Sequence, residues 1–246
     1  MAPLIFVALV RRNAAPYGRY SSSAWGSMLI PARVAWLTQE APSFLVPAGL
    51  LAYELARPAA SAAPLAALSP SSALLACFLV HYFHRAFVYP LAVQRGSKPT
   101  PLPIWLMALA FCTYNGVMQG LYLMYVHPAS GSRADAIFWL GLALWALGWG
   151  VNLHSDSVLR NLRAPGETGY KVPRGGAFEL VSAANYTGEI LEWAGFALAI
   201  RSLPGLAFAV FTFVNLAPRG AAHHEWYLKR FEHYPRSRRA VIPFLW

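Results

Sequence analysis

The sequence predicts an all-α fold: a polytopic membrane bundle of about seven transmembrane helices, with its N-terminus outside and its C-terminus in the cytoplasm. Of its 246 residues, 57% are hydrophobic and 12% are charged, whereas soluble domains usually carry about 25% charged residues. Three long stretches contain no Asp, Glu, Lys or Arg: residues 99–132, 136–155 and 202–218. Each stretch can hold a helix long enough to cross a bilayer, and a backbone in lipid must pair its own polar groups, as a helix does.

The apolar runs divide the chain into seven predicted spans. They lie near residues 2–14, 38–56, 71–91, 101–127, 135–156, 177–201 and 203–218. The first run lacks the preceding positive charges of a signal peptide, so we interpret it as a short first span. The Ala/Pro/Ser-rich segment 58–70 is a predicted loop, and Leu203-Pro204-Gly205 is a tight break between the last two spans. We find no internal repeat and expect a single membrane domain, residues 1–246.

The Lys and Arg residues favour alternate linkers, as in membrane proteins that keep their basic linkers in the cytoplasm. With the N-terminus outside, only three of the 20 Lys and Arg residues fall in outer linkers: Arg57, Arg133 and Arg201. Because the net charge of +10 is distributed in this way, we expect a lipid bilayer and no nucleic acid as partner. Cys77 and Cys112 lie inside apolar runs without metal-ligand spacing, so we expect no metal.

Ionisable side chains inside a membrane span are costly and usually face a cavity or a partner. Glu40 stands near the start of the second span, where a first-turn carboxylate would also be favoured by the helix dipole. In the third span, Tyr82, Arg85 and Tyr89 share one face. An interfacial aromatic belt could explain the tyrosines. It does not explain two histidines and an arginine within the segment His81–Arg85.

Three more polar stripes follow at helical spacing near the cytoplasmic ends of the last spans. They are Asn152, Asp156, Arg160 and Arg163; Asn185, Glu189 and Glu192; and Arg219, His223, Tyr227 and Arg230. Asp156 and Arg160 could simply form an i,i+4 ion pair. Together with the third-span stripe, they predict a water-accessible pocket for a large anionic ligand, and the surplus of Arg favours phosphate. The dinucleotide-binding Gly-rich fingerprint and the P-loop are absent. We interpret the basic segment 234–239 as lying against anionic headgroups.

Six blocks, in this order, resemble the steroid 5α-reductase (3-oxo-5α-steroid 4-dehydrogenase) family, and most of all its mammalian type 2 members. They are Gln39–Phe44, His81–Arg85, Phe111–Gly116, Asn152–Asp156, Leu162–Glu167 and Tyr234–Arg238. The resemblance extends from about Arg33 to Trp246. Met107, Lys171 and Glu225 are departures, since each stands where the type 2 enzyme has an arginine.

The resemblance implies that NADPH reduces the C4–C5 double bond of a 3-oxo-Δ4-steroid, of the testosterone or progesterone type, within a seven-helix bundle. It implies that the catalytic Glu40 and Tyr82 hold the 3-ketone. The cofactor-binding residues that it implies are Asn115, Asn152, Asp156, Arg163, Tyr170, Lys171, Asn185, Glu189, Arg219, His223 and Tyr227. Lysine at 171 weakens any bidentate phosphate contact there. We expect a multi-pass monomer in the bacterial inner membrane or the endoplasmic reticulum, with the cofactor site facing the cytoplasm.

The chemistry of the residues agrees with this role. Hydride addition to the β-carbon of an enone leaves an enolate, which a hydrogen-bond donor at the ketone oxygen stabilises. Tyr82 can donate, and Glu40 can donate if burial keeps it protonated, or can polarise the phenol as an acceptor. Three alternatives stay open: a reductase of another unsaturated lipid (a polyprenol or an enoyl thioester), an intramembrane methyltransferase using S-adenosylmethionine, and a sterol sensor without catalysis. The segment Arg219–Glu225 is a poor match to the methyltransferase motif.

Overall fold

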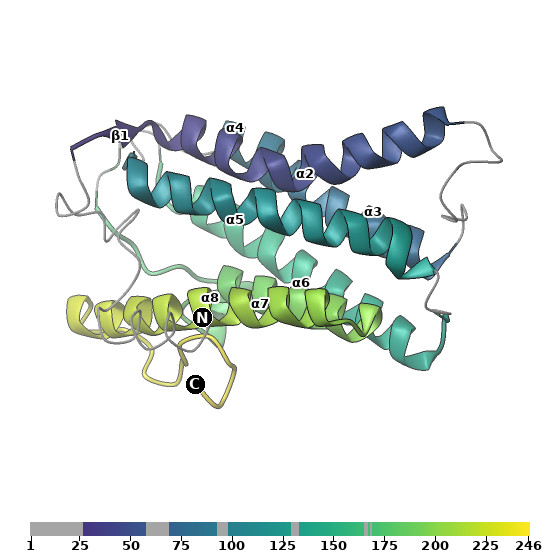
Figure 1. Ribbon diagram of the computed structural model, residues 1–246. Coiled ribbons are helices and arrows are strands. Elements are labelled where there is room, and N and C mark those ends of the chain that lie inside the picture. Colours follow the sequence, from purple (N-terminus) through teal and green to yellow (C-terminus); the bar gives the residue numbers. More distant parts are fainter. Residues whose placement is uncertain (1–26, 58–68, 93–97, 129–132, 165–166, 168) are drawn as a thin grey trace. The chain divides into compact units, whose positions relative to one another are not determined.

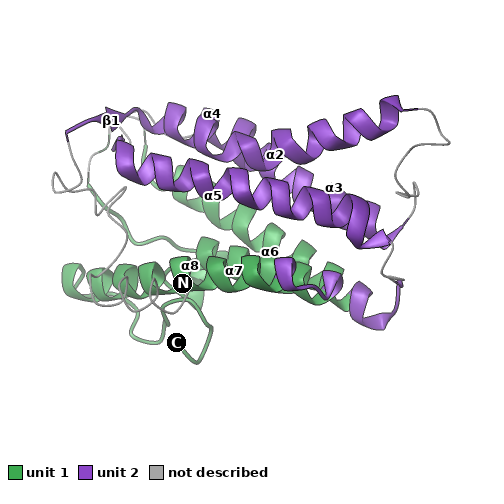
Figure 2. Cartoon of the chain, in the orientation of Figure 1, with its two compact units in different colours: residues 1–15, 140–198, 206–246 green, residues 16–139, 199–205 purple. Residues whose placement is uncertain are grey.

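The computed structural model describes residues 27–57, 69–92, 98–128, 133–164, 167 and 169–246. The first predicted span, residues 2–14, lies outside this part of the chain. The chain divides into two compact units, which Figure 2 shows in different colours. Of the described residues, 140–164, 167, 169–198 and 206–246 belong to unit 1, and 27–57, 69–92, 98–128, 133–139 and 199–205 belong to unit 2.

The described part of unit 2 contains three long helical segments (Figure 1). They are α2 (Ala32–Ala56); α3 (Pro70–Phe83), continued by the π-helical turn η4 (His84–Val88) and α4 (Tyr89–Ala92); and α5 (Leu102–Leu121), continued by the π-helical turn η5 (Tyr122–Val126). The two-residue strands β1 (Leu29–Ile30) and β2 (Thr100–Pro101) pair antiparallel. These segments match the predicted spans 38–56, 71–91 and 101–127, except that α2 begins six residues earlier.

Helices α2 and α5 lie side by side (Figure 1), because glycines on α5 face the prolines inside α2. A Cβ atom on Gly116 would lie 2.7 Å from the Pro42 carbonyl oxygen, and one on Gly120 would lie 3.0 Å from Pro47 Cβ. The hydroxyl of Ser43 donates to the Cys112 carbonyl oxygen at 2.8 Å. Small residues at i and i+4 let two helix backbones approach closely, and this contact fixes the turn of α2 that carries Glu40.

Unit 1 is built on most of α6 (Ala136–Arg160), α7 (Ala184–Ile200) and α8 (Leu203–Arg230), with a 3₁₀ turn η7 (Gly176–Glu179) before α7. Residues 136–139, at the start of α6, and residues 199–205, at the end of α7 and the start of α8, belong to unit 2. Helix α7 begins at Ala184, seven residues later than the predicted start, because the preceding residues pair with a distant segment. Helix α8 continues twelve residues past its predicted end. The apolar run stops at residue 218, but good helix formers such as Ala221, Ala222 and Leu228 extend the helix.

Glycines also bring α6 and α7 into direct backbone contact. A Cβ atom on Gly148 would overlap the backbone nitrogen of Glu192, and one on Gly188 would lie 2.5 Å from the backbone nitrogen of Asn152. The same holds farther along, where a Cβ atom on Gly195 would overlap the backbone of Trp145. This contact seats the polar end of α6 against the start of α7.

The C-terminal segment is part of the folded core of unit 1. Val181 forms a parallel bridge with Arg239, and the Ser182 amide donates to the Arg239 carbonyl oxygen at 2.8 Å. Val241 packs into a cluster with Ala183 and Ala217. These pairings explain the late start of α7.

The interpretation of the segment 234–239 as a headgroup-facing tail is wrong for Arg238, whose side chain is 0% exposed. Its guanidinium donates to the Pro173 carbonyl oxygen at 2.9 Å and to Glu179 at 3.2 Å. Arg236 and Arg239 are exposed.

Four helical segments of the described chain are long and apolar enough to cross a membrane: Pro70–Ala92, Leu102–Val126, Ala136–Arg160 and Leu203–Arg230. Helix α2 carries Glu40, Glu54 and two prolines, and α7 has 17 residues including Glu189 and Glu192. The mostly helical fold thus agrees with the predicted multi-pass membrane bundle. The number of seven spans, the N-out/C-in orientation and the single domain stay predictions.

Candidate active site

Within unit 2, Glu40 pairs with Arg85. The carboxylate of Glu40 lies 3.6 Å from the Arg85 guanidinium, and the two side chains are only 12% and 11% exposed. The guanidinium also lies over the rings of Trp36 and Tyr89, each 4.8 Å from the ring centroid. Glu40 is the ninth residue of α2, and no acidic residue stands in the first turn of that helix. The helix-dipole explanation for Glu40 is therefore wrong, and its charge is balanced by Arg85.

Tyr82, in the last turn of α3, is buried beside α5. Its hydroxyl accepts a hydrogen bond from the Asn115 side-chain amide at 3.2 Å. Its ring packs against Phe78 and His81, with centroid distances of 4.7 and 5.0 Å. The structure thus brings Asn115, predicted as a cofactor-binding residue, into contact with Tyr82, predicted to hold the substrate ketone.

The turn η4 begins two residues after Tyr82 and ends just before Tyr89. π-Helical turns add a residue to a helix and are common at functional sites. Across this turn Tyr89 reaches the ring of Trp36, with centroids 5.3 Å apart. Trp36 was not singled out from the sequence. Its position, four residues before Glu40 on α2, was the signal that could have identified it.

In unit 1, the buried stripe of α6 meets the first turn of α7. The side-chain amide of Asn152 donates to the Asn185 carbonyl oxygen at 2.9 Å. Asp156, one turn later, is buried as well. Between them Ser155 is fully buried, and its hydroxyl has no hydrogen-bond partner among the described residues. Such unsatisfied buried groups often mark a binding site.

The stripe on α8 is organised around Tyr186 of α7, which the sequence analysis missed. The Nε of Arg219 donates to the Tyr186 hydroxyl at 2.8 Å. His223 stacks on the Tyr186 ring with centroids 5.7 Å apart, and its Nε2 lies 3.4 Å from the hydroxyl. Tyr186 stands three residues before Glu189, on the predicted polar face of α7, so helical spacing could have identified it.

The remaining predicted cofactor residues lie on α7, on α8 and in the loop between α6 and α7. Tyr227 is buried and stacks parallel on Tyr234 at a centroid distance of 5.2 Å. Glu189 is half-buried on α7. Tyr170 packs edge-on against Trp226. In the loop between α6 and α7, Arg163 donates to the Gly169 carbonyl oxygen, and Lys171 pairs with Glu167.

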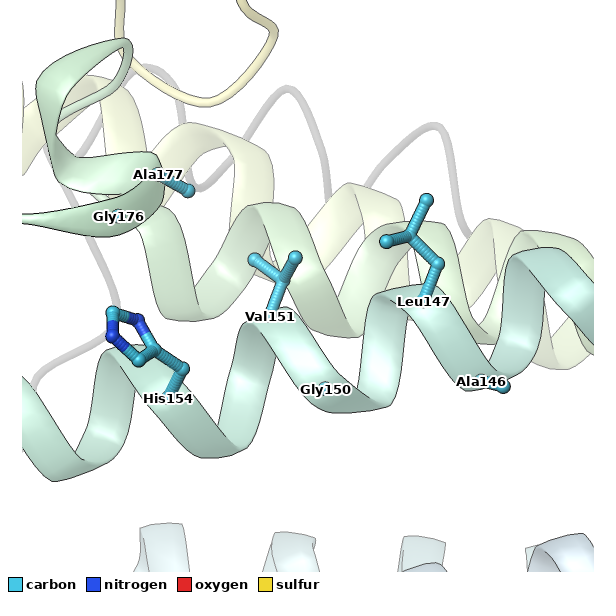
Figure 3. Close-up of a pocket in the computed structure, with 7 residues that line it drawn as sticks. All are labelled: Ala146, Leu147, Gly150, Val151, His154, Gly176 and Ala177. Atoms are coloured by element: carbon cyan, nitrogen blue, oxygen red, sulfur yellow. The ribbon is translucent and has the colours of Figure 1, made fainter.

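A shallow apolar pocket of about 350 Å³ opens on another face of α6 (Figure 3). It is lined by Ala146, Leu147, Gly150, Val151, His154, Gly176 and Ala177. Figure 3 shows the His154 imidazole directed toward Gly176, where a Cβ atom would lie 2.5 Å from the ring. This pocket contains none of the predicted site residues.

Hydrogen bonds and ion pairs of Glu179, in η7, connect the C-terminal segment to the loop before α7. The pKa of Glu179 is lowered because the Gly175 amide donates to its carboxylate at 2.7 Å and because Arg238 donates as well. Arg174 adds a weaker attraction at 3.8 Å. Arg238 therefore ties the C-terminal segment to the loop before α7.

Comparison with known proteins gives the family. Residues 98–246 match the family model described as 3-oxo-5-alpha-steroid 4-dehydrogenase. The bovine 3-oxo-5-alpha-steroid 4-dehydrogenase 1 is 50% identical over 98% of this chain and 92% of its own length. The chain belongs to this family. The human 3-oxo-5-alpha-steroid 4-dehydrogenases 1 and 2 are each 48% identical, over 96% and 97% of this chain and 88% and 91% of their own lengths.

The resemblance to the 3-oxo-5-alpha-steroid 4-dehydrogenase family is thereby confirmed. The identities do not set the type 2 enzymes above the type 1 enzymes. Because the family is one of oxidoreductases acting on a CH–CH bond of steroids, the methyltransferase and the non-catalytic sensor lose their support.

Proposed function

We propose that this protein uses NADPH to reduce the C4–C5 double bond of 3-oxo-Δ4-steroids to 5α-steroids, with Glu40 and Tyr82 at the 3-ketone. The proposed reaction rests on membership of the family. The observation that carries the site is the buried group in unit 2, where Glu40 is paired with Arg85 and Tyr82 is bonded to Asn115.

The reduction adds a hydride to C5 and a proton to C4, and NADPH, when bound, supplies the hydride. As C5 takes the hydride, the double-bond electrons move to the ketone oxygen, which develops enolate charge. Tyr82 stabilises that charge by donating its phenolic hydrogen in a site shielded from bulk water. A proton from solvent then adds to C4, and the enolate returns to the ketone.

The ion pair with Arg85 favours one of the two predicted roles of Glu40. The Glu40 carboxylate lies 3.6 Å from the Arg85 guanidinium, and a carboxylate in an ion pair accepts hydrogen bonds. We propose that Glu40, paired with Arg85, positions the ketone end of the site, while the one phenolic hydrogen of Tyr82 goes to the ketone oxygen. The rings of Trp36 and Tyr89 hold the guanidinium in place.

The polar stripe of unit 1 fits a large anionic cofactor. The buried Arg219 is oriented by Tyr186, and Ser155 retains unused hydrogen-bonding capacity. Aromatic side chains such as Tyr227 offer flat surfaces for a ring system. The residues that would hold NADPH are those predicted on α6, α7 and α8, with Arg163, Tyr170 and Lys171 in the loop. We propose that this site faces the cytoplasm and that the protein works as a monomer.

The test is NADPH oxidation by the detergent-purified protein with testosterone or progesterone, with the product identified by mass spectrometry. We expect a 5α-reduced steroid, and loss of turnover in Tyr82→Phe. Reduction of a polyprenol or an enoyl thioester, with none of the steroids, would instead select the other lipid reductase. Wild-type turnover in both Tyr82→Phe and Glu40→Gln would overturn the proposed role of these two residues.

A further inference from the structure

A chain of hydrogen bonds inside unit 2 ends at the Tyr82 hydroxyl. Asn115 donates to that hydroxyl at 3.2 Å, and Gln119 donates to the Asn115 side-chain oxygen at 3.4 Å. The same Gln119 nitrogen donates to the Pro204 carbonyl oxygen at 2.9 Å. Tyr82, Asn115 and Gln119 are 4%, 3% and 1% exposed, so bulk water does not compete for these bonds.

The donor-to-acceptor direction of these hydrogen bonds is set at the Pro204 end. The Pro204 carbonyl can only accept a hydrogen bond, so Gln119 must turn its NH₂ group toward it. The second N–H of that group goes to the Asn115 oxygen, which leaves the Asn115 NH₂ group facing Tyr82. The Gln119 oxygen has no hydrogen-bond partner among the described residues, so both bonds of this side chain run through its nitrogen.

The orientation of the Asn115 amide determines which hydrogen bonds the Tyr82 hydroxyl can form. A phenol has one hydrogen to donate and lone pairs with which to accept. The bond from Asn115 occupies a lone pair, so the phenolic hydrogen is directed to some other acceptor. If the Asn115 amide were turned round, its oxygen would take the phenolic hydrogen. Ser43 also lies beside the phenol. Because its own hydrogen is donated to the Cys112 carbonyl oxygen, its oxygen can accept the phenolic hydrogen until the steroid ketone takes that place.

We propose that Gln119 is a positioning residue that keeps Tyr82 a hydrogen-bond donor toward the steroid 3-ketone. It acts through Asn115, whose orientation it fixes, and Asn115 thereby belongs to the ketone end of the reaction. The proposal rests on the proposed function of Tyr82. A purely structural role, in which Gln119 only joins α5 to Pro204, is the competing explanation.

Gln119→Met tests the proposal because it removes both donors at similar volume. We expect kcat for the steroid to fall about tenfold or more, with the Kd for NADPH within twofold of wild type. Thr113→Val is the matched control, since this exposed hydroxyl of α5 bonds only within its own helix. Its kcat should equal that of the wild type.

The decisive measurement is a double-mutant cycle with Tyr82→Phe. If Gln119 acts through the phenol, Gln119→Met should cause no further loss of kcat in the Tyr82→Phe background. A structural role would lower kcat by the same factor in both backgrounds and would overturn the proposal. So would an unchanged kcat in Gln119→Met alone.

Two further readouts keep the result interpretable. If Gln119→Met fails to fold, Asn115→Asp tests the proposal instead. A carboxylate at this position takes the phenolic hydrogen without changing the side-chain size, so kcat should fall. A wild-type kcat in Asn115→Asp would overturn the proposal. If Tyr82→Phe itself keeps wild-type kcat, the proposed role of Tyr82 fails, and this result is distinct from a failure at Gln119.

Discussion

The backbone nitrogen of Asn152 occupies the place that a side chain on Gly188 would need, 2.5 Å from the Cβ position. Helices α6 and α7 therefore touch through their backbones at the point where the amide of Asn152 reaches the Asn185 carbonyl oxygen. The absence of a side chain on one helix thus sets the position of a polar residue on the other.

We predict that Gly188→Ala separates the two helices. It should destabilise the protein by about 1–3 kcal/mol, as overpacking of a filled interior does, and weaken NADPH binding. Thermal unfolding and cofactor titration in detergent measure both effects. Gly150→Ala is the control, because nothing lies within 4 Å of its Cβ position, and it should leave both quantities near wild type. Equal effects of the two substitutions would contradict the packing argument.

Tyr186→Phe should weaken cofactor binding selectively. The substitution removes the oxygen that accepts from Arg219 and leaves the ring stacked on His223. Loss of a hydrogen bond to a charged group costs about 1.5–3 kcal/mol, so we expect the Kd for NADPH to rise by a factor of about ten or more. The KM for steroid should stay within twofold. Tyr114→Phe, at an exposed site on α5, should change neither quantity.

Arg85→Met should impair steroid reduction because it leaves the Glu40 carboxylate buried without its cation. Removing one partner of a buried pair is strongly destabilising, by about 3–5 kcal/mol. We therefore expect lower thermal stability as well as lower kcat. Arg85→Lys should recover only part of both, since an ammonium lacks the planar surface that lies over Trp36 and Tyr89. Full recovery by lysine would argue that charge alone matters.

The ion pairs of Glu179 should make stability fall in acid. The pKa of this carboxyl is lowered in the folded state, first by the Gly175 amide and then by Arg238. A lowered folded-state pKa contributes stability above the ordinary carboxyl pKa of about 4.5, and this contribution is lost as the pH falls through the folded-state value. Glu179→Gln should therefore flatten the dependence of Tm on pH below about pH 5. An unchanged dependence of Tm on pH below about pH 5 would show that these contacts do not contribute to stability.

Much of the fold follows from hydropathy, because apolar runs of the right length become helices wherever the backbone must pair its own polar groups. The spans 71–91 and 101–127 match helical segments to within one residue at each end, and the span 135–156 matches α6 except that the helix runs four residues farther. The start of α7 could not be predicted from a local window. Residues 181–183 are extended because they pair with residues 239–240, almost sixty positions away.

The candidate site, too, could be predicted from the sequence only in part. Helical spacing correctly grouped Arg219 with His223, and the resemblance indicated Glu40 and Tyr82. Spacing could not reveal that Arg238 is buried or that Tyr186 orients Arg219, because these facts depend on contacts between helices. Gln119 was missed for the same reason, since an isolated amide in an apolar run has no distinctive local pattern.

The π-helical turn His84–Val88 has a consequence for how this protein tolerates change in length. Deleting one residue within the turn would leave composition and helicity almost intact, yet it would rotate everything downstream by about 100° around the helix axis. Tyr89 would then leave the ring of Trp36 and the guanidinium of Arg85. The number of residues between Tyr82 and Tyr89 is therefore itself a constraint on the site, and a substitution scan would not detect it.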